Sequence, residues 1–103
     1  MAKYLMIYHG GSMPEPAEMA AVQKAWGDWL GGMGAAIVDG GNPVGQSSTV
    51  LSDGSVKNDG GANPVSGYSI IEAPNLDGAL AHAKGCPVLS SGGTVEVAEA
   101  IDM

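Results

Sequence analysis

Two residues at predicted strand ends could form an acid–base pair. His9 ends an apolar and aromatic segment, residues 3–9, and a Gly-Gly pair follows it. Asp39 has the equivalent place in a second apolar segment, residues 35–41. If the two ends are neighbours, Asp39 could orient the imidazole and His9 could serve as a general base. Histidine and aspartate are ordinary residues at element ends, which favours the simpler interpretation of a solvated histidine and a turn-forming aspartate.

The single cysteine, Cys86, could be a nucleophile or a small buried apolar residue. A reactive thiol needs a lowered pKa, which a nearby histidine or a helix N-terminus can provide. Cys86 instead follows the predicted C-terminus of a helix, whose partial negative charge raises a thiol pKa. His82 lies four residues earlier, but Gly85 interrupts the helix between them. We therefore favour a packing role for the thiol.

Neither a metal nor a cofactor is predicted. Two distant histidines and one cysteine match no metal-ligand spacing, and the acidic residues show no calcium-loop pattern. The glycine-rich segment GGMGAAI, residues 31–37, follows a predicted helix and precedes a predicted strand. A dinucleotide-binding loop has the opposite order.

Composition and charge limit the classes of partner. The 103 residues contain four cations, all lysine, and eleven carboxylates, for a net charge of −7. Without a basic stripe, nucleic acid and anionic membrane surfaces are poor partners. No apolar run approaches the roughly 20 residues of a membrane span. We expect a single domain over residues 1–103, and the lone cysteine and the absence of a signal-peptide pattern predict a cytoplasmic location.

The elements that must position these residues follow from periodicity and turn residues. Ser12 or Glu15 is expected near the start of the first helix, Gly31, Gly32 and Gly34 at its end, and Asn75 as the cap of the second. The Asp-Gly pair at 53–54 predicts a β-hairpin. In chain order we expect a strand at 3–9, a helix reaching 33, a strand at 35–41, the hairpin around 52–55, a strand at 66–73, a helix at 76–84 and a strand at 94–100.

This order predicts an α+β fold of the ferredoxin-like, split βαβ type, with an inserted β-hairpin and an antiparallel sheet. Two helices would cover one face of the sheet. We place Tyr4, Met6 and Tyr8 on the other, apolar face, which a second copy would cover in a homodimer. A small molecule would bind in the cleft between the helices and the sheet edge. Trp26, Tyr68 and Cys86 are the candidate ligand contacts, although tryptophans in such a helix are more often core residues.

Several segments carry a resemblance to a known family. The segment GYSIIEAPNLDGALAHAKGCP at 67–87, followed by GGTVEV, resembles the YCII-related family, including its DGPF branch. KYLMIYHGG and AIVDGGNPVGQSSTV resemble the family's first strand, its second strand and the entry to its hairpin, so the resemblance covers nearly the whole chain. It implies sheet-to-sheet dimerisation into an α+β barrel and, by analogy, lyase or isomerase chemistry on an unknown small molecule.

The chain departs from this family at its functional positions. Residues 59–62 read Asp-Gly-Gly-Ala, which is half of the DGPF signature. The family's proposed catalytic histidine would fall near Glu18 and Met19, and its aspartate at Cys86, so that pair is missing. Two hypotheses stay open: an acid–base enzyme using His9 and Asp39, or a non-catalytic dimeric binding or accessory module. A purely structural dimer is a third.

Overall fold

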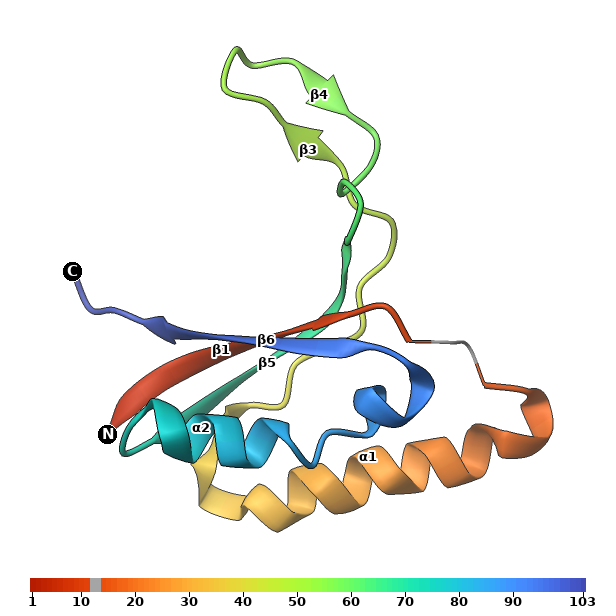
Figure 1. Ribbon diagram of the computed structural model, residues 1–103, viewed down its shortest axis with the longest axis vertical. Coiled ribbons are helices and arrows are strands. Elements are labelled where there is room, and N and C mark those ends of the chain that lie inside the picture. The colour runs from red at the N-terminus through yellow and green to blue at the C-terminus, as the bar shows by residue number, and fades with distance from the viewer. Residues whose placement is uncertain (12–13) are drawn as a thin grey trace.

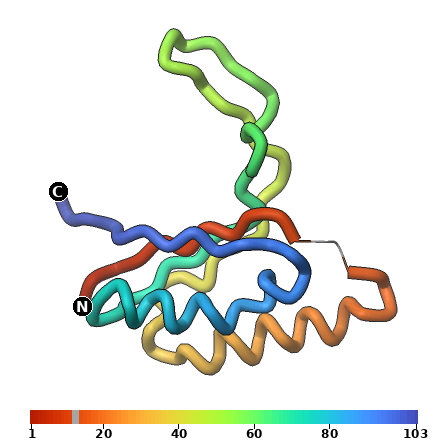
Figure 2. The backbone as a smooth tube through the Cα atoms, viewed as in Figure 1, coloured from red at the N-terminus to blue at the C-terminus, as the bar shows by residue number. Residues whose placement is uncertain are grey.

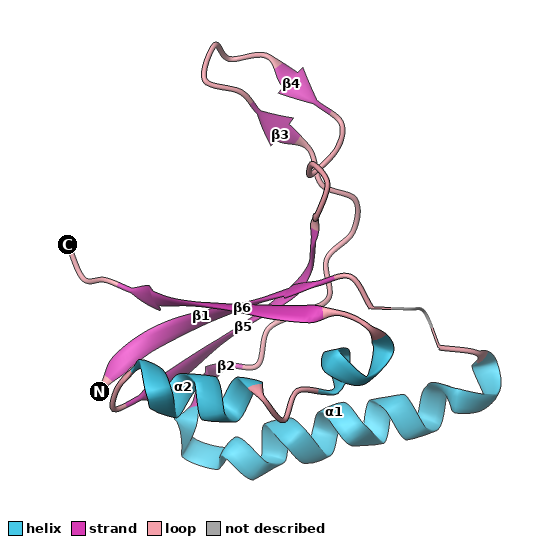
Figure 3. Cartoon of the chain, viewed as in Figure 1, coloured by secondary structure: helices cyan, strands magenta, loops and turns pink. Residues whose placement is uncertain are grey.

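A computed structural model describes residues 1–11 and 14–103 as a mixed α+β fold (Figure 1). Its two α-helices lie on one face of an antiparallel sheet (Figure 3). The predicted fold class is confirmed at this level. Short 3₁₀ helices cover Pro16–Glu18, Gly34–Ala36 and Pro87–Ser91. The main elements are β1 (Ala2–His9), α1 (Met19–Met33), β2 (Ile37–Asp39), β3 (Thr49–Val50), β4 (Val56–Lys57), β5 (Val65–Ala73), α2 (Leu76–Ala83) and β6 (Thr94–Ala100).

The main sheet has the strand order β2-β5-β1-β6. Its central strand β1 is antiparallel to both neighbours, with Met6 opposite Ser69 of β5 and opposite Val97 of β6. The two ends of the chain therefore form adjacent strands (Figure 2). Among the described helices, none has the length and apolar composition that crossing a bilayer requires.

The side of the sheet that the helices cover differs from the prediction. Tyr4, Met6 and Tyr8 were placed on the uncovered face, but they are only 3%, 0% and 5% exposed and belong to the core beneath the helices. The opposite face, called here the open face, carries the alternate residues Leu5 and Ile7. Alternation determines which residues share a face, whereas helix packing determines which face is covered.

The predicted helix ends are confirmed only in part. α1 continues through Gly31 and Gly32 and ends at Met33, as predicted, and Gly34 follows as its C-cap with a φ of +54° that glycine adopts easily. A 3₁₀ turn follows, so β2 is shorter than predicted. Asn75 caps α2 by accepting a hydrogen bond from the Gly78 amide at 2.9 Å. Of the two predicted starts of the first helix, Glu15 makes no side-chain cap bond, and Ser12 lies outside the described residues.

The predicted hairpin forms a separate two-stranded sheet, with Val50 opposite Val56. The hairpin and its connecting segments, residues 45–64, are called the arm. The arm rises from the main sheet on the side opposite the helices (Figure 1). Val50 and Val56 are 70% and 60% exposed, so the arm brings apolar surface of its own to the open-face side.

Candidate functional site

A cleft of about 1110 Å³ lies between α1 and the end of the sheet where β1 finishes and β5 begins. The α1 wall carries Val22, Trp26 and Leu30. The facing wall includes Tyr8, Tyr68 and the segment 40–44, and the 3₁₀ helix near 87–91 contributes a third side. The cleft is therefore built from segments that are far apart in the sequence.

Local sequence accounts for both main walls. On α1, residues at four-residue spacing share one face of the helix, which lines up Val22, Trp26 and Leu30 along the cleft. On the opposite wall, Gly41 has a φ of +77°, and a Cβ there would collide with the carbonyl oxygen of Tyr68. The absence of a side chain lets the segment after β2 lie directly against β5.

Three aromatic side chains form a cluster beside the cleft. The ring centroid of Tyr8 lies 5.1 Å from that of Trp26 and 6.2 Å from that of Trp29, and all three pairs meet edge to face. The Trp29 indole donates a hydrogen bond to the His82 carbonyl at 2.9 Å. Trp29 is thus fixed behind the wall, while Trp26 is half-buried and lines the cleft. An aromatic wall of this kind suits an apolar or aromatic ligand.

The Tyr8 hydroxyl is not available as an acid–base group. It donates to Ser69 Oγ at 2.6 Å, and Ser69 in turn donates to the Gly40 carbonyl at 2.7 Å. Burial raises the pKa of Tyr8 to about 12, although the Ser69 hydrogen bond acts in the opposite direction. The phenol is therefore protonated near neutral pH, and its proton is already engaged.

His9 lies on the open face and is not one of the residues that line the cleft. Its Nε2 is 2.9 Å from Glu96 Oε1, and its Nδ1 is 2.9 Å from the Asn63 carbonyl and 3.3 Å from that of Pro64. Carboxylate and carbonyl oxygens only accept, so both ring nitrogens donate only in the imidazolium form. The Glu96 hydrogen bond accordingly raises the pKa of His9, against a lowering by burial.

The structure does not bring His9 and Asp39 together. β5 lies between β1 and β2, so the two strand ends are not neighbours. Asp39 instead accepts a hydrogen bond from the Gly41 amide at 2.8 Å, as in the turn-forming interpretation. Glu96, which the sequence did not single out, is the acidic partner of His9. Its position in β6 opposite Ile7, next to the His9–Thr94 pair, becomes visible only from the strand order.

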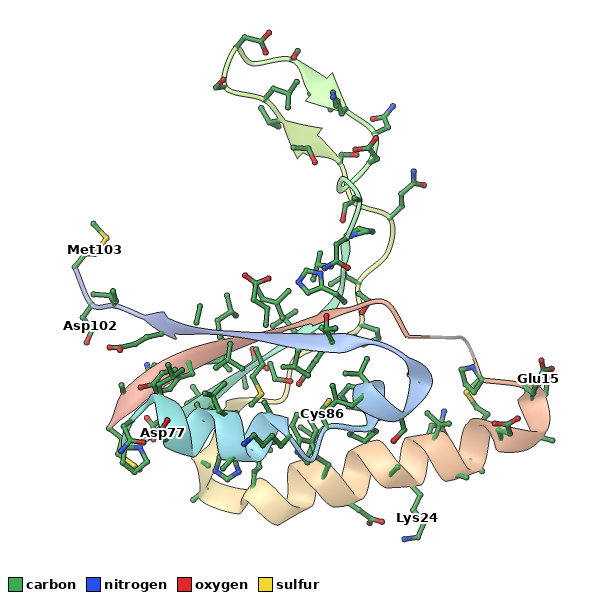
Figure 4. All side chains as sticks on the ribbon, in the orientation of Figure 1. Glu15, Lys24, Asp77, Cys86, Asp102 and Met103 are labelled. Carbon is green, nitrogen blue, oxygen red and sulfur yellow. The ribbon has the colours of Figure 1, made fainter. Side chains whose placement is uncertain are left out.

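Of the three predicted ligand contacts, two belong to the cleft lining and one does not. Trp26 and Tyr68 are both lining residues, but Tyr68 is opposite Ile7 and its side chain alternates onto the open face. Cys86 is not a lining residue, although the next two residues are. Cys86 is 3% exposed and lies between the sheet and the helices (Figure 4). Burial raises the pKa of the Cys86 thiol to about 11, which agrees with a packing role rather than a nucleophile.

Other kinds of site have little support in the described residues. Across 1–11 and 14–103, no group of three or more histidine, cysteine, aspartate or glutamate side chains is placed to hold a metal ion. The sequence analysis also missed Glu18, which lines the cleft four residues before Val22 on the same helical stripe. The four-residue spacing itself was the signal that could have identified it.

Neither a scan against protein-family models nor a search of curated proteins finds a match to this chain.

Proposed function

We propose that the protein binds a small, largely apolar molecule in the cleft between α1 and the sheet, as a binding or accessory module. The observation that carries this proposal is the aromatic-walled cleft of about 1110 Å³. Pockets for small molecules typically measure about 300–1,000 Å³ and are lined mainly by apolar and aromatic side chains. This cleft is therefore large enough for a ligand of ordinary size.

The alternative is an acid–base lyase or isomerase, which needs a proton-transfer group within reach of its substrate. His9 and Asp39 both lie outside the cleft lining, and each is engaged by hydrogen bonds elsewhere. The Tyr8 hydroxyl is held by Ser69. Glu18 is the one carboxylate among the described lining residues, and neither a histidine nor a second carboxylate lines the cleft beside it. The cleft therefore lacks an acid–base pair, which supports the binding module over the enzyme.

Binding can be tested with 4-phenylbutanol as a neutral aromatic probe. In a two-dimensional NMR titration, the indole N–H resonance of Trp26 should move more than that of Trp29, which is bonded to a carbonyl behind the wall. Ala21→Phe should abolish binding because Ala21 lines the cleft and the added ring would fill it. Ala20→Phe is the matched control, since Ala20 is exposed and outside the lining. No binding to the wild type, or equal binding to both variants, would contradict the proposal.

We also propose that the chain is a ferredoxin-like homodimer. Leaving out the arm, the order βαββαβ and the sheet order β2-β5-β1-β6 support the split βαβ topology. On β1 and β5 the open face is apolar, with Leu5 opposite Ile70 and Ile7 opposite Tyr68, while Glu96 of β6 lies beside Ile7. The apolar part of this face suits a second sheet. The net charge of −7 makes nucleic acid and anionic membranes poor partners, and a reducing, cytoplasmic location fits the free, buried Cys86.

A further inference from the structure

The described residues that line the cleft include one negatively charged side chain and no positively charged one. Glu18 is its one side chain with a formal charge among the described lining residues. Apart from its histidines, the protein has four cationic side chains, all of them lysines. None of these lysines lines the cleft: Lys3, Lys24, Lys57 and Lys84. Lys24 is on α1, six residues after Glu18, but it pairs with Asp28 at 2.8 Å and points away from the sheet (Figure 4). An anionic ligand would therefore find a carboxylate and no cation.

The Glu18 carboxylate is available to a ligand. Glu18 is the N-cap residue of α1, where the positive end of the helix dipole, about half an elementary charge, offsets only part of its negative charge. Its side chain makes no capping hydrogen bond and forms no ion pair within the described residues. It is exposed at one end of the cleft, so a bound cation would keep part of its hydration.

The helix sets the distance between this charge and the aromatic wall. Val22 and Trp26 lie four residues apart on one face of α1, and Glu18 precedes Val22 by the same step at the N-cap; all three line the cleft. With a rise of 1.5 Å per residue, the eight residues from Glu18 to Trp26 span about 12 Å. The stripe thus presents a carboxylate, an aliphatic side chain and an indole in that order.

From this arrangement we infer that the cleft selects a cationic amphiphile, namely an ammonium group carried on an elongated apolar or aromatic body, and disfavours carboxylates and phosphates. The ammonium group pairs with Glu18 while the apolar body lies along Val22 and reaches Trp26. This inference rests on the proposed function, because it names the ligand class of the same cleft. Selection is moderate, since ion pairs exposed to water contribute little free energy.

Three probes with the same ring and chain but different charge test the inference: 4-phenylbutylamine, 4-phenylbutanol and 4-phenylbutyrate. Their affinities at neutral pH can be measured through tryptophan emission, excited where the phenyl ring does not absorb. We expect the amine to bind roughly five-fold more tightly than the alcohol, and the carboxylate to bind more weakly than either. Glu18→Gln should bring the amine and alcohol to equal affinity. Glu15→Gln, which removes an equal charge outside the cleft lining, should keep the preference.

The results distinguish a failure of charge selection from a failure of ligand binding in the cleft. If all three probes bind equally, if the carboxylate binds most tightly, or if the amine preference survives in Glu18→Gln, the charge selection is wrong and the cleft still binds small molecules. If none of the probes binds, both the proposed function and the ligand class are wrong.

Discussion

His9 is held by three acceptors from two parts of the chain. Glu96 belongs to β6, while the Asn63 and Pro64 carbonyls lie where the arm returns to the sheet. His9 therefore joins the arm to the sheet, and this structural role accounts for a histidine at the end of β1. His9 should accordingly be exchangeable without loss of ligand binding in the cleft.

Removing the charge of Glu96 should lower the pKa of His9. The Glu96 hydrogen bond is the largest cause of its raised pKa, so Glu96→Gln should shift the NMR titration curve of His9 toward lower pH. Glu99→Gln is the matched control, because Glu99 lies on the same strand and makes no contact with His9. Equal His9 titration curves in the two variants would show that Glu96 is not the cause.

The same bond makes stability depend on pH with a definite sign. The pKa of His9 is raised in the folded state above its ordinary value of about 6.5. Its contribution to the free energy of unfolding is therefore fully present below that pH and is lost as the pH rises through the folded-state pKa. In Glu96→Gln, the free energy of unfolding should fall less than in the wild type over the same rise in pH.

Among the elements, the turn that follows β2 can pack against β5 only because of one glycine. Gly41→Ala should destabilise the fold by more than about 2 kcal/mol, because the new Cβ meets the Tyr68 backbone and the φ is positive. Gly45→Ala is the matched control, since nothing lies within 4 Å of its Cβ position and its φ is ordinary. The comparison is made by urea unfolding. Similar midpoints would mean that the segment after β2 does not pack on β5 this closely.

Most element positions could be predicted because they depend on local chemistry. The last strand, at 94–100, the Asn75 cap and the Asp53-Gly54 turn agree with the structure. The end of α1 was less certain, because three glycines are close together and only Gly34 has the positive φ. The covered face of β1 was assigned wrongly, since alternation alone does not decide it.

The candidate site was harder to predict because it depends on the order of strands in space. His9 and Asp39 stand at similar places in the sequence pattern, but β5 separates their strands. Trp26 could be placed because it shares a helical stripe with other apolar residues. Cys86 and its neighbours show the limit of such reasoning: Pro87 and Val88 line the cleft, whereas the cysteine beside them is in the core.

At the scale of the whole molecule, the open face and the arm lie on the same side of the sheet (Figure 1). A second copy on this face would also lie beside Val50 and Val56 of the arm. Isolated two-stranded hairpins are marginally stable in water, so a partner on this side would stabilise the arm as well as cover the sheet.

Sedimentation velocity should give twice the chain mass for the wild type. Leu5→Lys should produce a monomer, because it places a charge between Ile70 and Ala98 on the open face. Ala20→Lys adds the same charge on the exposed side of α1 and should remain dimeric. Circular dichroism verifies that both variants are folded. A monomeric wild type, or a dimeric Leu5→Lys variant, would contradict dimerisation through this face.

The position of β1 between β5 and β6 has a consequence for biosynthesis. β1 leaves the ribosome before both of its partners, which begin at Val65 and Thr94. The centre of the sheet therefore stays unpaired while most of the chain is being made, and pairings between such distant segments form slowly. Tyr4, Met6 and Tyr8 lack their partners during that interval, so we expect the growing chain to be most prone to aggregation before β6 emerges.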